Sequence, residues 1–426
     1  MTIQARGFTA PGFFVFPPHG LHSTVAKRSS KSKGEPREVE LPPPIPVSAP
    51  APIPLSAVLG HPDPIRILHA SIASGRLHHA WIFHGPRGVG KFTAALAFAA
   101  TILDPTSEPG LLGTGAGAIA PDPDSPVQRL LAAGTHPDLH IITKELAKFS
   151  DDPDIRARKL ITIPKEIVEQ HLIRPASLSP VLRNNASIGK VFIIDEAELL
   201  DRSATNAPTQ NAILKTMEEP DGRTVIILVT SSLERLLPTI RSRCQQVRFA
   251  PLPPDAMRTW LMRQPETPER EELAWLLESS EGSPGEFQTA RTAGLYQWHL
   301  TIAPMLADII RGKDRPELGS VMASLVEDAA KAAVEADKQT SKEAATRQGA
   351  YRLFRMVLQS LRSHLRLALP RPGTPDWNDA ACRAIDAVEN ARRTLEAQVN
   401  PAFAFEELST DLDAAFVGVA HASPGR

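Results

Sequence analysis

Cysteine is nearly absent from this chain of 426 residues, which contains only Cys244 and Cys382. Two cysteines so far apart cannot build a disulfide framework or a cysteine-rich zinc site, and their scarcity suits a reducing cytoplasm. No run approaches the ~20 apolar residues that a membrane-spanning helix needs. The net charge of -1 argues against a protein that binds nucleic acid alone through a positive surface, although it leaves room for local basic patches. We therefore expect a cytoplasmic protein without membrane contacts.

Residues 1–54 show neither helix nor strand patterns. Prolines crowd positions 42–54, and we expect an extended, disordered tail there. The first 34 residues contain five basic residues and no acidic ones, which weakly resembles an organelle transit peptide. An unstructured basic tail is the simpler interpretation.

From residue 55 onward, apolar runs alternate with helical segments. The runs AWIFH (80–84), VFIID (191–195) and TVIILVTSS (224–232) predict a parallel sheet covered by helices on both faces. A stretch at about 104–135, rich in Gly, Pro and Asp in its first part, is interpreted as an insertion. We expect an α/β domain over 55–250, a small helical lid over 251–290 and an all-α domain over 295–420. The Ala/Glu/Lys-rich stretch 327–349 predicts an exposed helix.

The string GPRGVGK (85–91) lies between the first predicted strand and a helical run, which is the setting of a phosphate-binding P-loop. Its glycines allow backbone N–H groups to turn toward phosphate oxygens, and its lysine reaches the terminal phosphates at the start of the helix. The residues predicted to contact the nucleotide are Gly85, Arg87, Gly88, Val89, Gly90, Lys91, Phe92 and Thr93.

The position after Lys91 normally holds a Ser or Thr whose hydroxyl binds Mg²⁺, but in this sequence it is Phe92. Thr93 lies about 100° further around the helix, so we expect its hydroxyl to point elsewhere. The loop is therefore expected to hold ATP or ADP with Mg²⁺ bound weakly or not at all, and hydrolysis is expected to be impaired. The alternative is that a water replaces the hydroxyl and activity survives.

Polar side chains follow two of the predicted strands. Asp195 is placed to hold a metal through water, and Glu196 to orient or deprotonate an attacking water. Thr230, near the end of the third strand, is placed to reach the γ-phosphate or that water. The alternative for all three residues is an ordinary solvated strand end.

Two further strings are NAILKTMEEP (211–220) and LLPTIRSRCQ (236–245). Together with GRLHHAWIFHGPRGVGK (75–91) and HPDL (136–139), they resemble the bacterial DNA polymerase III clamp-loader subunits of the AAA+ superfamily, most closely the delta-prime type. The likeness is detailed over 55–250 and weaker from GSPG (282–285) to VNPAFAFEEL (399–408). It implies an AAA+ domain, a lid and a helical collar. It also implies partners: gamma/tau and delta subunits, and through the complex the sliding clamp and primer–template DNA.

The resemblance implies roles for individual residues. Arg243 is the expected arginine finger, which would stabilise charge on the γ-phosphate in a neighbouring subunit, with Arg241 as the second candidate. The helix around 211–220 is expected near the DNA, although it also fits a plain amphipathic helix with Ile213, Leu214 and Met217 in the core. The residues expected to contact the DNA backbone are Gln210, Asn211 and Lys215.

Two departures from the family pattern bear on activity. The insertion that carries a four-cysteine zinc module in many relatives contains no cysteine here, so no zinc is expected. Glu286 stands after GSPG, where many relatives have an arginine. Together with Phe92, this favours a delta-prime-like stator with weak or no ATPase over an active gamma/tau-like clamp-loader ATPase. A nucleotide-independent scaffold and another AAA+ helicase loader are the remaining alternatives.

Overall fold

The computed structural model describes residues 50–107, 119–157, 161–182, 188–201, 206–218, 223–336, 341–367, 375–397 and 399–417. Residues 1–49 of the predicted tail and residues 108–118 of the predicted insertion lie outside these ranges. Within them, a five-stranded parallel sheet has the order β2-β3-β4-β1-β5. Its strands are β1 Ala80–His84, β2 Leu139–Ile142, β3 Lys190–Ile194, β4 Thr224–Thr230 and β5 Gln245–Arg248.

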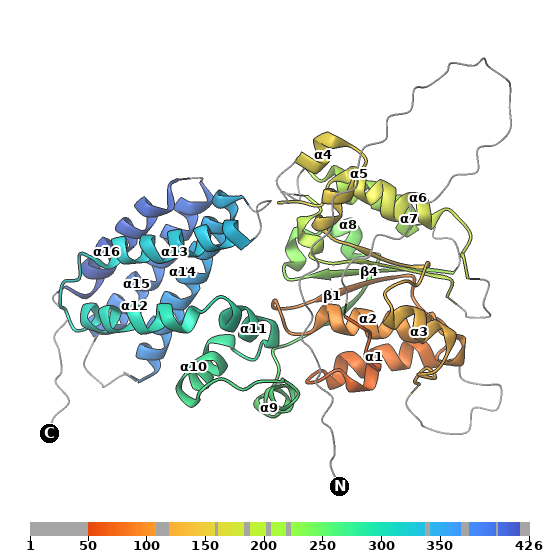
Figure 1. Cartoon of the computed structure of the whole chain (residues 1–426), viewed down its shortest axis with the longest axis horizontal. Helices are drawn as coiled ribbons and strands as arrows, with labels where there is room; N and C mark the ends of the chain where they lie inside the picture. The colour runs from red at the N-terminus through yellow and green to blue at the C-terminus, as the bar shows by residue number, and fades with distance from the viewer. Residues whose placement is uncertain are drawn as a thin grey trace, which may run out of the picture. The chain divides into compact units, whose positions relative to one another are not determined.

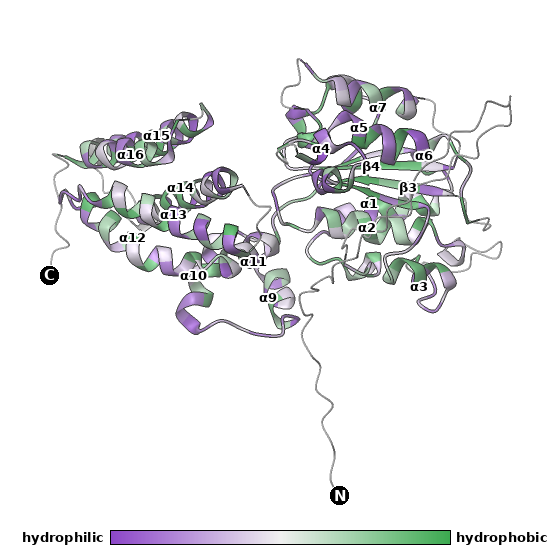
Figure 2. Ribbon diagram, turned by 45° about the horizontal axis from the view of Figure 1, so that its top comes forward, coloured by the Kyte–Doolittle hydropathy of each residue, from purple (hydrophilic) through white to green (hydrophobic). Residues whose placement is uncertain are grey.

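The strands β1, β3 and β4 have continuous apolar interiors because both faces of the sheet are covered. Their polar residues, His84, Lys190, Thr224 and Thr230, lie only at the strand ends. Successive side chains point to opposite faces, so Phe83 belongs to one buried cluster and Ile82 to another. In the same way, β3 sends Ile193 to the first cluster and Phe192 to the second. Figure 2 shows the strand β4 as largely hydrophobic between helices of mixed hydropathy. The predicted parallel sheet between two helical layers is confirmed.

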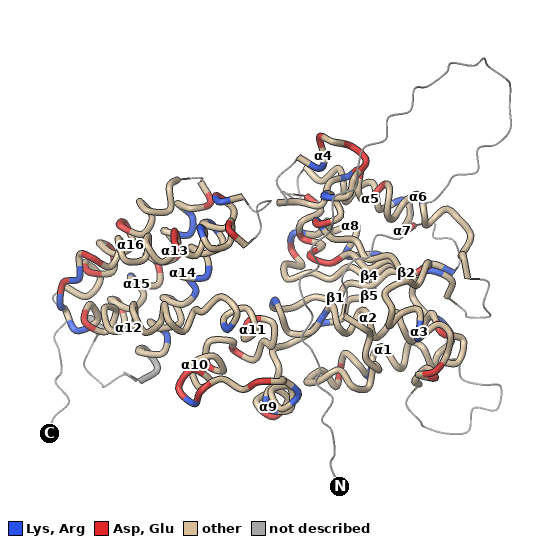
Figure 3. The backbone as a smooth tube through the Cα atoms, in the orientation of Figure 1, with Lys and Arg blue, Asp and Glu red and all other residues tan. Residues whose placement is uncertain are grey.

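The helices form a layer on each side of the sheet (Figure 1). One layer contains α1 Pro62–Ala73, α2 Lys91–Ile102 and α3 Pro126–Ala132. The other layer is built from shorter pieces: α4 Pro153–Ala157, α5 Lys165–Val168, the π-helical turn Glu169–Ile173, α6 Arg174–Ala176, α7 Pro208–Glu218 and α8 Pro238–Arg241. Figure 3 shows that charged residues gather on the helices and are sparse on the strands.

The rest of the described chain is helical. Three short helices follow the sheet: α9 Pro254–Met262, α10 Arg270–Ser280 and α11 Pro284–Thr292. Longer helices complete the chain: α12 Leu295–Ile310, α13 Leu318–Ala336, α14 Lys342–Leu367, α15 Pro375–Glu396 and α16 Pro401–Phe416. No helix of the described residues is long and apolar enough to cross a membrane.

Several details differ from the sequence-based expectation. The strands β2 and β5 were not predicted, and β3 and β4 end one and two residues earlier than the predicted strands. The prediction of a single helix over 327–349 is wrong, because α13 ends at Ala336 and α14 begins at Lys342. The later part of the predicted insertion contains the helix α3, which Ser125 caps by accepting a hydrogen bond from the backbone N–H of Gln128.

Candidate functional site

The loop between β1 and α2 has the backbone geometry of a phosphate cradle. Gly85, Gly88 and Gly90 have φ angles of 143°, 70° and 101°, which L-residues with side chains rarely adopt. At Gly85 a Cβ atom would also lie only 2.0 Å from the carbonyl oxygen of Phe249. The helix α2 begins directly after Gly90, so the free N–H groups of its first turn face the loop.

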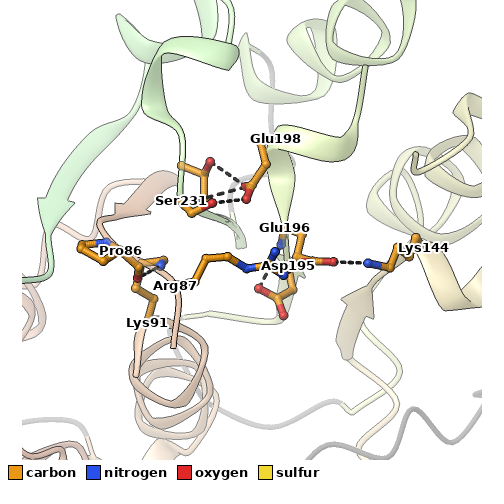
Figure 4. A network of polar contacts seen from close by, with 9 residues as sticks. Pro86, Arg87, Lys91, Lys144, Asp195, Glu196, Glu198 and Ser231 are labelled. Atoms are coloured by element: carbon orange, nitrogen blue, oxygen red, sulfur yellow. Dashed lines mark hydrogen bonds and ion pairs between the residues drawn. The ribbon is translucent and has the colours of Figure 1, made fainter. Parts of the chain in front are cut away.

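Lys91 lies inside this loop. Its Nζ donates hydrogen bonds to the carbonyl oxygens of Gly85, at 2.7 Å, and Pro86, at 2.5 Å (Figure 4). Burial lowers the pKa of Lys91 to about 8, although Glu198 and Asp195 oppose the change. The amino group of Lys91 is thus still largely protonated at neutral pH, and its positive charge is available to bind a phosphate oxygen.

A cavity of about 650 Å³ opens beside the loop. The loop, the ends of β3 and β4, the segment 53–59 and the helices α9 and α11 line it. Phe92 and Thr93 both reach its wall, and Phe92 also packs against the hydrophobic core. The side chain that replaces the usual hydroxyl therefore offers carbon in place of an oxygen ligand.

The two acidic residues after β3 have different surroundings. Asp195 lines the cavity, and burial raises its pKa to about 6. Glu196 has a left-handed backbone conformation, with φ 49°. One of its carboxylate oxygens binds Arg87, and the other accepts a hydrogen bond of 2.6 Å from Lys144 (Figure 4). The predicted general base is therefore held between two cations.

Glu198 is a site residue that the sequence reasoning missed. Its side chain is buried and accepts hydrogen bonds from the hydroxyl of Thr230, at 2.8 Å, and from both the hydroxyl and the backbone N–H of Ser231. Burial by itself would raise the pKa of Glu198, but these hydrogen bonds outweigh burial and hold the pKa below its usual value. Thr230, predicted to face the γ-phosphate, donates to Glu198 in this structure.

The start of α11 is attached to the phosphate loop. The backbone N–H of Gly285 donates to the carbonyl oxygen of Gly88 at 2.8 Å, and the Ser283 hydroxyl donates to that of Arg87 at 2.8 Å. Glu286, the next residue of α11, does not line the cavity and forms an ion pair with Arg355 of α14. The position after GSPG is therefore acidic and bound to another helix.

Arg243 lies outside the cavity, just beyond α8. Its side chain is 40% exposed, and its Nη2 lies 2.7 Å from Oε1 of Glu218, at the end of α7. Its Nη1 donates to the carbonyl oxygen of Thr239 at 3.0 Å. Cys244, the next residue, is partly buried, and burial raises the pKa of its thiol to about 12.

The predicted DNA-contacting residues on α7 do not share one environment. Gln210 is fully buried. Its side-chain amide donates to the carbonyl oxygen of Arg235 and accepts from the backbone N–H of Leu237, which joins α7 to the turn that precedes α8. The prediction that Gln210 contacts DNA is therefore wrong, because its side chain has no exposed surface. Asn211 and Lys215 are exposed, and their role at DNA stays a prediction.

The described residues contain no group of three or more His, Cys, Asp or Glu side chains arranged to hold a metal ion. Around the cavity, the loop amides and Lys91 are suited to binding phosphate, whereas the oxygen ligands for Mg²⁺ are incomplete. The loop is thus chemically suited to contact phosphate oxygens.

Residues 60–253 match the family model described as DNA polymerase III, delta subunit. The chain is 35% identical over 209 residues to the DNA polymerase III subunit delta' of Pseudomonas aeruginosa, covering 48% of this chain and 53% of that protein. It is 30% identical over 207 residues to the subunit delta' of Bacillus subtilis, covering 49% and 53%. It is also 29% identical over 209 residues to the subunit gamma/tau of Mycobacterium tuberculosis, covering 48% and 30%.

The chain thus spans about half the length of the delta' relatives that it matches. The matched region contains the sheet, the phosphate loop and Arg243. For this region, the resemblance to the clamp-loader subunits that the sequence indicated is confirmed.

Proposed function

We propose, from the relationship of residues 60–253 to the delta-prime subunits of DNA polymerase III, that this chain is a clamp-loader stator. In this role its AAA+ domain binds a nucleotide with little or no hydrolysis, and its C-terminal helices assemble with gamma/tau and delta subunits in the cytoplasm. Arg243 reaches the nucleotide site of a neighbouring ATPase subunit. The assembly then places the sliding clamp on primed DNA.

The observation that carries this proposal is the contrast between the chain's own site and Arg243. Around the cavity, Phe92 removes a metal-binding oxygen, and Glu196 is engaged by Arg87 and Lys144. Arg243 is exposed and does not line that cavity. Because a guanidinium stabilises charge on a transferring phosphoryl group, an exposed arginine in this motif is suited to a neighbour's site.

A nucleotide fits the residues present. The three positive-φ glycines expose loop amides, Lys91 supplies a cation within the loop, and the cavity of about 650 Å³ has the size of a small-molecule site. When bound, ATP or ADP would supply phosphate oxygens for these donors. Mg²⁺ would contribute little here, since Phe92 has no ligand atom.

The test is the DNA-stimulated ATPase of a reconstituted loader containing this chain with either Arg243 or Arg243→Ala. We expect the substitution to lower hydrolysis at the neighbouring site by about 10³-fold or more, because an arginine finger contributes on that scale. Arg241→Ala tests the second candidate for the finger and should leave the rate unchanged if Arg243 is the finger. An unchanged rate with Arg243→Ala would favour the nucleotide-independent scaffold.

The second candidate function is that of an active gamma/tau-like ATPase, and the similarity to a gamma/tau subunit supports it. The two functions differ in the isolated chain. A stator shows weak or no DNA-stimulated hydrolysis by itself, whereas a motor subunit shows hydrolysis that Lys91→Ala abolishes.

A further inference from the structure

We propose that Glu218 is the positioning residue for the arginine finger: its carboxylate fixes the direction in which Arg243 presents its guanidinium to a neighbouring subunit. This inference rests on the proposed function and adds a residue that acts through Arg243. Glu218 does not line the chain's own cavity, and in this proposal it acts on the neighbour's nucleotide only through Arg243.

The geometry comes from two elements that are distant in sequence. Glu218 is the last residue of α7, and Arg243 lies beyond α8. The ion pair spans 2.7 Å between Oε1 and Nη2, while the opposite amino group, Nη1, donates to the carbonyl oxygen of Thr239 at 3.0 Å. The guanidinium is therefore held at both terminal nitrogens.

Two contacts leave several of the five guanidinium N–H groups for a phosphate. Glu218 and Arg243 are 47% and 40% exposed, so their ion pair contributes little to folding stability. Instead, the ion pair restricts the conformation of the Arg243 side chain. An arginine side chain has several rotatable bonds, and holding it in one arrangement before the neighbour docks removes an ordering cost from the transition state.

The helix that carries Glu218 is itself held in place by buried residues. Its helix α7 is anchored by the buried Ile213 and Met217, and by the Gln210 amide, which binds the backbone just before α8. The helix that carries Glu218 and the turn that leads to Arg243 are thus fixed to one another. A side chain placed at the end of such a helix has a defined position relative to Arg243.

The experiment uses the full chain in a reconstituted loader in which only the nucleotide site facing Arg243 remains active. We compare Glu218→Gln, Arg243→Ala and the double variant, with Glu271→Gln as a control at an exposed glutamate of α10. We expect Glu218→Gln to lower kcat about threefold to tenfold and to change KM for ATP less than twofold, because misplacement affects the transition state more than binding.

In the double variant we expect the rate of Arg243→Ala alone, since Glu218 acts only through the finger. Glu271→Gln should leave kcat unchanged. Gel filtration checks that all variants assemble equally, so that a change in kcat cannot come from lost assembly.

The outcomes separate the two proposals. If Arg243→Ala has no effect, the proposed function fails, and this inference fails with it. If Arg243→Ala abolishes hydrolysis but Glu218→Gln leaves kcat unchanged or raises it, only the positioning role is overturned. A further loss in the double variant beyond Arg243→Ala would likewise overturn it, because Glu218 would then act by another route.

Discussion

The raised pKa of Asp195 leads to a prediction about stability. Burial raises its pKa from 3.8 to about 6, so the native state disfavours the ionised carboxylate. At about 1.4 kcal/mol per pKa unit, ionised Asp195 costs the fold at most about 3 kcal/mol above pH 6. Asp195 keeps some solvent access, which reduces this figure. We therefore expect Asp195→Asn to raise the free energy of unfolding by about 2 kcal/mol at pH 7.5.

The sign follows from which state binds the proton more tightly. Because the folded-state pKa lies above the unfolded value, the cost is absent below pH 3.8, grows between the two values and is complete above pH 6. The stabilisation by Asp195→Asn should therefore shrink as the pH approaches 4. An amide oxygen can still accept the hydrogen bond that the Glu196 backbone N–H now donates to Asp195.

Hydrogen exchange of peptides from β3 and β4 measures this effect in the sheet itself, which matters because a chain of several domains need not unfold in one step. Asp124→Asn, at an exposed loop position, is the control and should change stability by less than about 0.5 kcal/mol. The reasoning is refuted if Asp195→Asn is neutral or destabilising at pH 7.5, or if its gain does not depend on pH.

Two other predictions concern the loop and α7. Because the pKa of Lys91 is about 8, its charged fraction falls about tenfold between pH 7 and pH 9, and the affinity for ATP should weaken by about the same factor. Calorimetric titration at both pH values measures this change, and pH-independent affinity would contradict it. Gln210→Ala should destabilise the fold by about 2–3 kcal/mol, because it removes two hydrogen bonds of a fully buried side chain. A urea titration measures the loss, and a neutral substitution would contradict this prediction.

The sequence predicted the central strands because they are continuous apolar runs. The strand β1 matches its predicted bounds. The strand β2 is short and contains His140, which is partly buried. Its ring stacks on Phe192 at 4.7 Å, a neighbour that no local pattern reveals. The strand β5 lies at the sheet edge and buries only Val247 among its four residues. An edge strand with polar exposed positions lacks the apolar signal of a central strand.

The same limit applies to the site. The glycines and Lys91 could be predicted because their chemistry depends on a contiguous motif. The ion pair between Lys144 and Glu196 could not, since it requires β2 to lie beside β3 in the sheet. The burial of Gln210 was likewise hidden, because a polar residue at the start of an amphipathic helix resembles a surface residue until its tertiary partners are known.

The glycines of the phosphate loop are required by packing, independently of whether the loop takes part in phosphate chemistry. A side chain at Gly85 would collide with the Phe249 carbonyl, and one at Gly88 would lie 2.8 Å from the Cα atom of Gly285. Substitutions at these glycines are therefore excluded by the fold itself, whether or not the chain ever cleaves a phosphate. We therefore expect a related chain that had lost nucleotide binding altogether to keep these glycines, because the packing of the loop requires them. The loop motif in a sequence thus indicates common descent even where nucleotide is no longer bound.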